Sequence, residues 1–285
     1  QAARAVVAFN STVKTYRVTI DRTAPTRSDL DLLNGLVCSS NDAETVFRQQ
    51  CDAFSVDRVT GRFYQQYRAI FRRFQVALQP QAEAVRQAVR RRSGRDETVH
   101  AFTVRLLGRM MFLHFLQKKG WLAGDPRFLE RRYEECVERG DLYYNDVLEP
   151  LFFEYLSTRT GQDSPWGCIP YLNGGLFMRE YAENLVLYIP NDLFDPDRDP
   201  ARRGLLGFFA GYNFTVDEDT PLDVQVALDP ELLGKVFENL MEEEQRGQTG
   251  TFYTPRPIVN FMVREALIHR LAEMTSPPIE RRRLL

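Results

Sequence analysis

The stretch SVDRVTGRFYQQYRAIFRRFQVAL, residues 55–78, decides the fold class. Its large apolar side chains recur every three or four residues, which is the period of one face of an α-helix. These residues are Val59, Phe63, Tyr67, Ile70, Phe74 and Leu78. Ser55 precedes them and is a typical N-cap residue. The pattern predicts a long helix that buries one side.

Further helical patterns follow this one along the chain. A run from about Glu97 to Lys119 is apolar on most sides, as in a central helix, and Gly120 stands at its expected end. Asp125-Pro126 and Asp229-Pro230 each place a capping carboxylate before a proline at the first helical position. Residues 142–158 predict a helix kinked at Pro150.

Strands are expected mainly near the N-terminus. Residues 5–20 hold a period-two alternation around Tyr16, Val18 and Ile20, with Val6–Phe9 as a hairpin partner. Prolines and glycines gather in residues 160–200, where Asn184–Ile189 could add a short strand. The fold class is therefore mainly α: a multi-helix domain with a small N-terminal β-hairpin and a loop-rich segment near 160–200.

The amino-acid composition limits the possible functions of the protein. The chain has 285 residues, with 37 basic against 39 acidic side chains, so nucleic-acid contact would need a local patch. Four cysteines without a C-x-x-C pair and three histidines predict no metal site. No signal peptide or membrane-length apolar run is evident, so we expect a cytoplasmic protein with no membrane partner. A start at Gln1 and an end at Leu284-Leu285 after three arginines suggest a piece of something longer.

The most informative motif is Gly250-Thr251-Phe252-Tyr253-Thr254-Pro255-Arg256-Pro257. It predicts a loop that enters a helix, with Thr254 as N-cap and Pro255 at the first helical position. Free amides at a helix start favour an anion. Capped helix starts of this kind are common, however, and most of them bind nothing.

This motif resembles the loop called motif X in gamma-class N6-adenine DNA methyltransferases. The resemblance implies that Thr251, Phe252, Tyr253, Thr254 and Pro255 contact S-adenosylmethionine. Four upstream islands are similar, in the same order, to the helical connector of bifunctional type IIG restriction–modification enzymes and related phage-defence methylases. They are Ile169–Phe177, Ile189–Asn191, Tyr212–Thr215 and Leu228–Gly234.

The resemblance implies three segments. Residues 1–27 would be the end of an upstream module, 28–245 the helical connector domain, and 246–285 the truncated start of the methyltransferase domain. The glycine-rich cofactor turn and the Asn/Asp-Pro-Pro-aromatic motif of such enzymes are missing, since Ser276-Pro277-Pro278-Ile279 lacks the aromatic residue. We therefore expect no catalytic residue in this chain, and the acid-x-lysine pair of a restriction nuclease is also missing.

A cluster of arginines is the best candidate for contacts to DNA phosphates. It comprises Arg86, Arg90, Arg91, Arg92 and Arg95. A solvated charged segment between two helices is the alternative explanation.

The resemblance implies a parent protein that transfers a methyl group from S-adenosylmethionine to N6 of adenine in double-stranded DNA. Its partners would be the remaining methyltransferase and target-recognition domains of the same chain, with or without a nuclease domain. The fragment alone would be inactive. The alternative is a non-catalytic helical module that binds protein or DNA.

Overall fold

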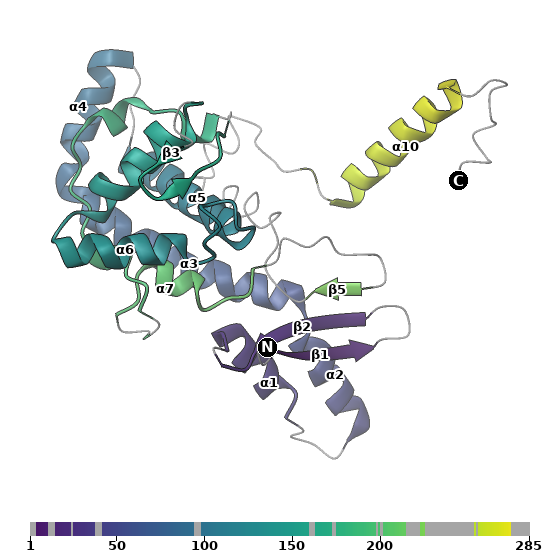
Figure 1. Ribbon diagram of the computed structural model, residues 1–285. Coiled ribbons are helices and arrows are strands. Elements are labelled where there is room, and N and C mark those ends of the chain that lie inside the picture. The colour runs from purple at the N-terminus through teal and green to yellow at the C-terminus, as the bar shows by residue number, and fades with distance from the viewer. Residues whose placement is uncertain are drawn as a thin grey trace. The chain divides into compact units, whose positions relative to one another are not determined.

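The computed structural model describes residues 4–10, 15–23, 25–37, 42–93, 98–159, 163–172, 175–197, 199, 202–214, 223–225, 254 and 256–274 (Figure 1). The chain divides into two compact units, Gln1–Leu240 and Met241–Leu285. The first unit holds the described strands and most described helices, and the second holds α10 (Arg256–Met274). The mainly helical fold class is confirmed. The segment limits expected from the resemblance, at residues 27 and 245, stay a prediction.

A small sheet forms the N-terminal part of the first unit. Strand β1 (Arg4–Asn10) runs antiparallel to β2 (Thr15–Asp21), which confirms the predicted hairpin. Strand β5 (Asp223–Gln225) pairs with β2 in parallel, giving the order β1-β2-β5. This third strand comes from a segment about two hundred residues away, so no local pattern predicts it.

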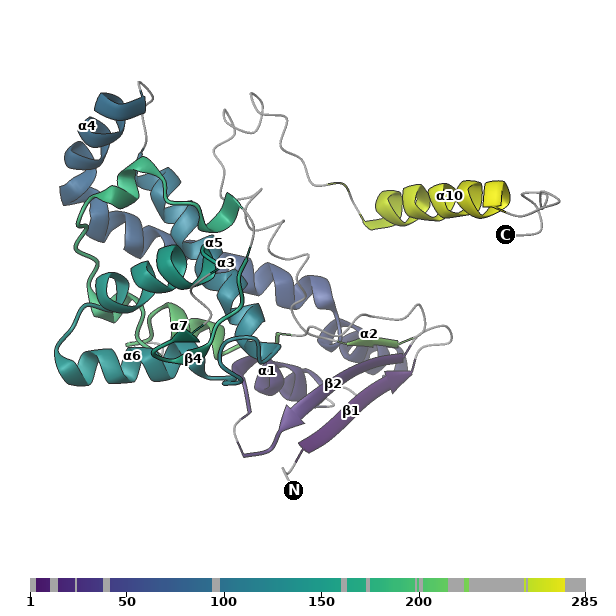
Figure 2. The same ribbon diagram turned by 45° about the horizontal axis from the view of Figure 1, so that its top comes forward.

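Two short helices, α1 (Arg27–Gly35) and α2 (Ala43–Ala53), accompany this sheet (Figure 2). The inward side chains of β2, Val18 and Ile20, pack with Leu32 of α1 and with Phe54 in a small separate core. The alternation that predicts β2 therefore identifies its buried face correctly.

The large core of the first unit is built on α3 (Val56–Leu78) and α5 (Val99–Lys118), which pack on each other. Ser55 accepts a hydrogen bond from the backbone N–H of Arg58, which confirms the predicted N-cap. The predicted stripe of α3 is buried from Phe63 to Leu78, and Val59 is half-buried. Burial of each such side chain is worth about 1.5–3 kcal/mol before entropy is counted.

Helix α5 is buried on nearly every side, as the sequence predicts for a central helix. The side chain of Thr98 caps its start by accepting from the backbone N–H of Ala101. Gly120 follows the C-cap with a φ of +73°, a conformation that glycine adopts without strain.

One segment and one helix start differ from expectation. The arginine-rich segment, which the alternative explanation placed between two helices, is itself helical, because η1 (Gln79–Gln81) and α4 (Ala82–Ser93) follow α3 directly. Helix α6 (Phe128–Arg139) begins after Arg127, not at Pro126, because the Asp125 carboxylate accepts from the backbone N–H of Arg127 in a turn before the helix. The expected helix at Asp229-Pro230 lies outside the described residues.

The predicted helix over 142–158 is present, with an unusual winding. Segments η2 (Tyr143–Leu148) and η3 (Leu151–Leu156) are π-helical and are joined through Glu149 and Pro150. Pro150 has no N–H and its ring clashes with the preceding turn, so a wider winding around it accommodates the ring. The kink predicted at this proline is thus a change of helical pitch on both sides.

The segment from 160 to 200 is loop-rich, as predicted. It holds a two-stranded ribbon of β3 (Asp163–Ser164) and β4 (Gly167–Cys168), and three short 3₁₀ turns. These turns are η4 (Gly175–Phe177), η5 (Tyr181–Asn184) and η6 (Asn191–Leu193). The strand expected at Asn184–Ile189 is wrong, because the described backbone there has no strand partner. Helix α7 (Leu205–Phe209) then returns into the core.

Candidate functional site

The cofactor-loop motif leads into α10, which begins at Arg256, one residue after the first helical position expected at Pro255. Thr254 is described and its side chain is exposed. The other four residues assigned to cofactor contact lie outside the described residues: Thr251, Phe252, Tyr253 and Pro255. The helix after the loop is therefore confirmed, and the cofactor role of the loop stays a prediction.

Helix α10 carries an unusual number of exposed apolar side chains. They are Ile258, Val259, Phe261, Met262, Val263, Leu267 and Leu271, each at least 41% exposed, whereas Ile268 is buried. At 100° per residue these positions point to several sides of the helix, not to a single stripe. Exposed apolar side chains on several sides of a helix are typical of one that packs inside a larger domain, although Arg264 and Arg270 are exposed on α10 as well.

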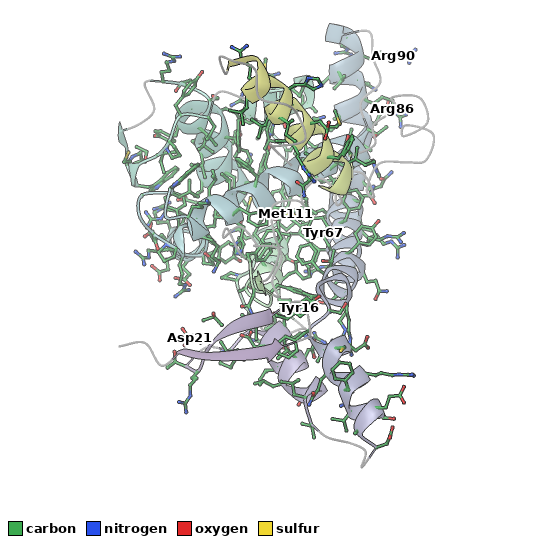
Figure 3. All side chains as sticks on the ribbon, turned by 90° about the vertical axis from the view of Figure 1, so that its right-hand side faces the viewer. Tyr16, Asp21, Tyr67, Arg86, Arg90 and Met111 are labelled. Carbon is green, nitrogen blue, oxygen red and sulfur yellow. The ribbon has the colours of Figure 1, made fainter. Side chains whose placement is uncertain are left out.

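The predicted arginine cluster is partly brought together by α4. Arg86 and Arg90 are exposed one helical turn apart (Figure 3). Arg91, the next residue along the helix, is exposed as well. Arg86 forms an ion pair with Glu83 at 3.2 Å. Arg92 belongs to α4 but its side chain is not among those described, and the whole of Arg95 lies outside the described residues.

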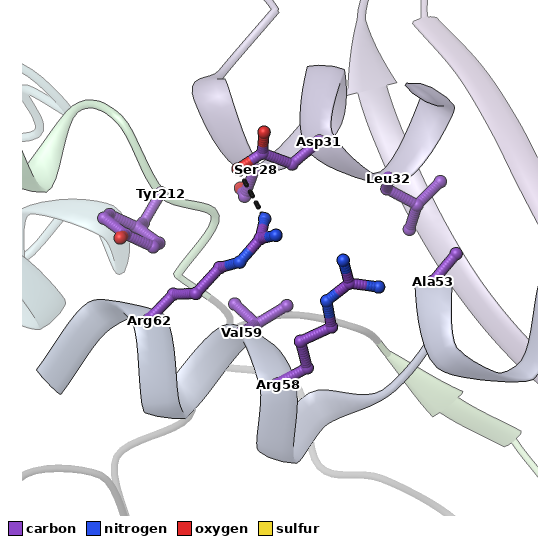
Figure 4. Close-up of a pocket in the computed structure, with 8 residues that line it drawn as sticks. All are labelled: Ser28, Asp31, Leu32, Ala53, Arg58, Val59, Arg62 and Tyr212. Carbon is purple, nitrogen blue, oxygen red and sulfur yellow. Dashed lines mark hydrogen bonds and ion pairs between the residues drawn. The ribbon is translucent and has the colours of Figure 1, made fainter. Parts of the chain in front are cut away.

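A small pocket lies where α1 and the end of α2 meet α3 (Figure 4). Arg62 forms an ion pair with Asp31 at 2.9 Å inside it, and Arg58 pairs with Asp52 at 3.5 Å. Its volume of about 30 Å³ has room for roughly one water molecule. A second pocket, between α3, α4 and the start of α5, has a volume of about 180 Å³ and is lined in part by Gln75, Arg86 and His100. Drug-sized ligands occupy pockets of roughly 300–1,000 Å³, so neither pocket fits S-adenosylmethionine.

Ile169–Phe177, the first of the four segments similar to restriction–modification enzymes, contacts the buried side chain of Arg109 in α5. The guanidinium donates to the carbonyl oxygens of Leu176 at 2.6 Å and of Met178 at 3.0 Å. It also donates to both carboxylate oxygens of Glu183, and both side chains of this ion pair are 1% exposed. The island therefore supplies a hydrogen-bond acceptor to a buried charge.

Two further islands have structural roles as well. The amide of Asn191 accepts from the backbone N–H of Tyr143 at 2.8 Å and donates to the carbonyl of Asp141 at 2.9 Å, which fixes the start of η2. The amide of Asn213 donates to the buried carboxylate of Asp29 at the first turn of α1. These asparagines stabilise the helical unit through these hydrogen bonds. The fourth island, Leu228–Gly234, lies outside the described residues.

A second buried polar network surrounds Gln117. Its side-chain NH₂ group donates to Nδ1 of His114 at 3.0 Å and to the Glu130 carboxylate at 3.2 Å. Its carbonyl oxygen accepts from the backbone N–H of Leu129 at 3.0 Å. Burial, reinforced by Lys118, holds the pKa of His114 well below its ordinary value, and burial raises the pKa of Glu130. This network joins α5 to α6, and it explains Gln117 as a structural residue.

Within the described ranges, no three His, Cys, Asp or Glu side chains are grouped to hold a metal ion. No described helix is long and apolar enough to cross a membrane.

Comparison with known proteins finds a relative with significant sequence similarity. The chain is 32% identical over 179 residues to a protein of Methanocaldococcus jannaschii that is named as a candidate type II restriction enzyme and methyltransferase. The match covers 58% of this chain and 14% of that relative, so the matched region is a small part of a much longer protein. No family model matches the chain, and no solved structure matches it.

Proposed function

We propose that this chain is the helical connector and first cofactor-binding segment of a restriction–modification methyltransferase. The proposed parent transfers a methyl group from S-adenosylmethionine to N6 of adenine in DNA. The observation that carries the proposal is the similarity to the Methanocaldococcus jannaschii protein, whose name joins restriction with methyl transfer. A cytoplasmic location and a role in defence against phage follow as parts of the same proposal.

Helix α10 supports this assignment physically. It follows the Thr-Pro loop directly and exposes apolar side chains on several sides, such as Ile258, Phe261 and Leu267. Apolar side chains around a whole helix are stabilised by cover from further structure. A methyltransferase core that packs around α10 would provide this cover and would hold the loop of Thr254 at its surface.

The described residues supply only part of a cofactor site. Thr254 offers an exposed hydroxyl beside the start of α10. S-adenosylmethionine supplies the methyl group when bound, and the remaining pocket would come from the core that α10 enters. The role of the first unit is positional: its buried Arg109–Glu183 and His114–Gln117–Glu130 networks hold the helices in fixed arrangement.

The loop can be tested by equilibrium binding of S-adenosylmethionine to the complete gene product. We expect Tyr253→Ala and Thr254→Ala to weaken binding about tenfold or more, since removal of a stacking or hydrogen-bonding group costs roughly 1–2 kcal/mol. Thr158→Ala is a matched control, because Thr158 is exposed and lies in the first unit.

Unchanged affinity in both loop variants would contradict the cofactor role of residues 251–255. Absence of any binding by the folded complete protein would instead favour the non-catalytic helical module.

A further inference from the structure

The segment from α3 to α4 has a charge quite unlike the rest of the chain. Residues 56–93 contain nine arginines and only two acidic residues, Asp57 and Glu83, which gives a net charge of +7. The whole chain has a net charge of −2, so the remaining residues together carry −9. A local field of this kind attracts a polyanion even though the protein as a whole is slightly acidic.

The fold leaves most of this charge exposed to solvent. The buried stripe of α3 leaves Arg68, Arg72 and Arg73 exposed on the opposite side of the helix. Figure 3 shows α3 and α4 one above the other along one side of the protein, with Arg86 and Arg90 of α4 at its outer edge. We call the exposed side chains Arg68, Arg72, Arg73, Arg86, Arg90 and Arg91 the arginine face.

Much of the arginine face is not neutralised by carboxylates. Only Arg86 forms an ion pair with an acidic side chain there, to Glu83, among the residues that the structure describes. Arg73 donates to the backbone carbonyl of Arg203, a hydrogen bond that leaves its positive charge uncompensated. By contrast, Arg58 and Arg62 nearer the start of α3 are paired with Asp52 and Asp31.

The spacing fits a nucleic-acid backbone. Arginines four residues apart, such as Arg68 and Arg72 or Arg86 and Arg90, lie about 6 Å apart along a helix. A duplex presents one phosphate charge per ~1.7 Å of its axis, so successive turns of both helices can each meet a phosphate. The guanidinium group binds phosphate oxygens with two parallel N–H donors. Two exposed glutamines of the same segment, Gln65 and Gln79, can donate to the same backbone.

We propose that the arginine face of α3 and α4 binds the phosphate backbone of duplex DNA without reading its sequence. The choice of duplex DNA among polyanions rests on the proposed function. The face extends the cluster expected on residues 86–95 by three arginines of α3. The first unit would then bind the DNA backbone while other parts of the protein recognise and modify the DNA.

The test is binding of the full chain to a fluorescently labelled duplex of mixed sequence, followed by anisotropy across a series of salt concentrations. The variant Arg72→Gln/Arg90→Gln/Arg91→Gln removes three exposed charges and keeps good helix formers. The matched control is Arg127→Gln/Arg131→Gln/Arg139→Gln, which removes three exposed arginines of the α6 region, each paired with an acid.

We expect the α3–α4 variant to bind at least about tenfold more weakly than the wild type. Its slope of log affinity against log salt should fall by about 0.9 for each phosphate that the variant no longer neutralises. The control should keep the affinity and slope of the wild type within about twofold.

Equal losses in both variants, or no loss in either, would overturn the proposal. Stronger binding of polyglutamate than of duplex, with the same loss in the α3–α4 variant, would assign the face to an acidic protein and also overturn it. If the DNA result is as expected while the complete protein transfers no methyl group, the arginine face stands and the proposed reaction fails.

Discussion

Replacing Glu183 by glutamine tests a fully buried ion pair of the first unit. The side chains of Glu183 and Arg109 are each 1% exposed and form a bidentate ion pair. The carboxylate also accepts from the backbone N–H of Glu180 at 2.7 Å and lies 3.6 Å from Arg105. Glutamine keeps the shape and one acceptor oxygen but leaves the buried guanidinium without its counter-charge.

Removal of one partner from a buried pair costs about 3–5 kcal/mol, because the other charge stays buried and uncompensated. The retained amide oxygen and the carbonyls of Leu176 and Met178 still accept from Arg109. The expected decrease in free energy of unfolding is therefore near the lower end, about 3 kcal/mol. The Arg109 guanidinium also lies over the rings of Phe152 and Phe153, at 5.4 and 5.1 Å from their centroids, which limits the decrease.

Urea unfolding at neutral pH, followed by circular dichroism, measures this decrease. Glu134→Gln is the control, since Glu134 pairs with Arg127 on the surface and such pairs contribute about 0–1 kcal/mol. A change below about 1 kcal/mol in Glu183→Gln, equal to that of the control, would refute the reasoning about the buried pair.

Two further predictions concern stability. The buried His114 has a pKa lowered by desolvation, so only the unfolded chain takes up its proton below the ordinary value of 6.5. The free energy of unfolding of the wild type should therefore fall relative to that of His114→Gln as pH drops below about 6.5, by up to about 1.4 kcal/mol per pH unit. Thermal melts of both proteins at about pH 7 and 5.5 measure this difference. An equal pH dependence of the two proteins would contradict the prediction. A Cβ at Gly207 would lie 1.9 Å from the carbonyl oxygen of Asp197, whereas a Cβ at Gly61 in α3 would meet nothing within 4 Å. Gly207→Ala should therefore lower the melting temperature, whereas Gly61→Ala should raise it by the equivalent of about 1 kcal/mol. A shift of the melting temperature in the same direction in both variants would contradict the packing described.

Local patterns predict the parts of the fold that depend on local physics. The stripe from Phe63 to Leu78, the N-cap Ser55 and the C-terminal Gly120 each follow from periodicity or capping preference, and each is confirmed. The pairing of β5 with β2 and the late start of α6 do not follow from such patterns. Strand β5 is short and distant in sequence, and the start of α6 depends on which turn the Asp125 carboxylate stabilises.

The candidate site is predictable to a smaller degree. The helix after the Thr-Pro loop follows from Thr254 and two prolines, which mark its start. The arginines of α3 are harder to find, because helical periodicity explains them as the polar side of an amphipathic helix. A running net charge over residues 56–93 is the signal that identifies them. The partners of Arg109 cannot be predicted locally, because Leu176 and Glu183 lie in short 3₁₀ turns far along the chain.

The most direct measurement for the central claim is transfer of labelled methyl groups from S-adenosylmethionine to unmethylated DNA by the complete gene product, with the modified base identified by mass spectrometry. We expect label in N6-methyladenine and a sharp decrease in Tyr253→Ala and Thr254→Ala. Label in another base, or no label on DNA of varied sequence from a folded protein, would contradict the proposed transfer to N6 of adenine.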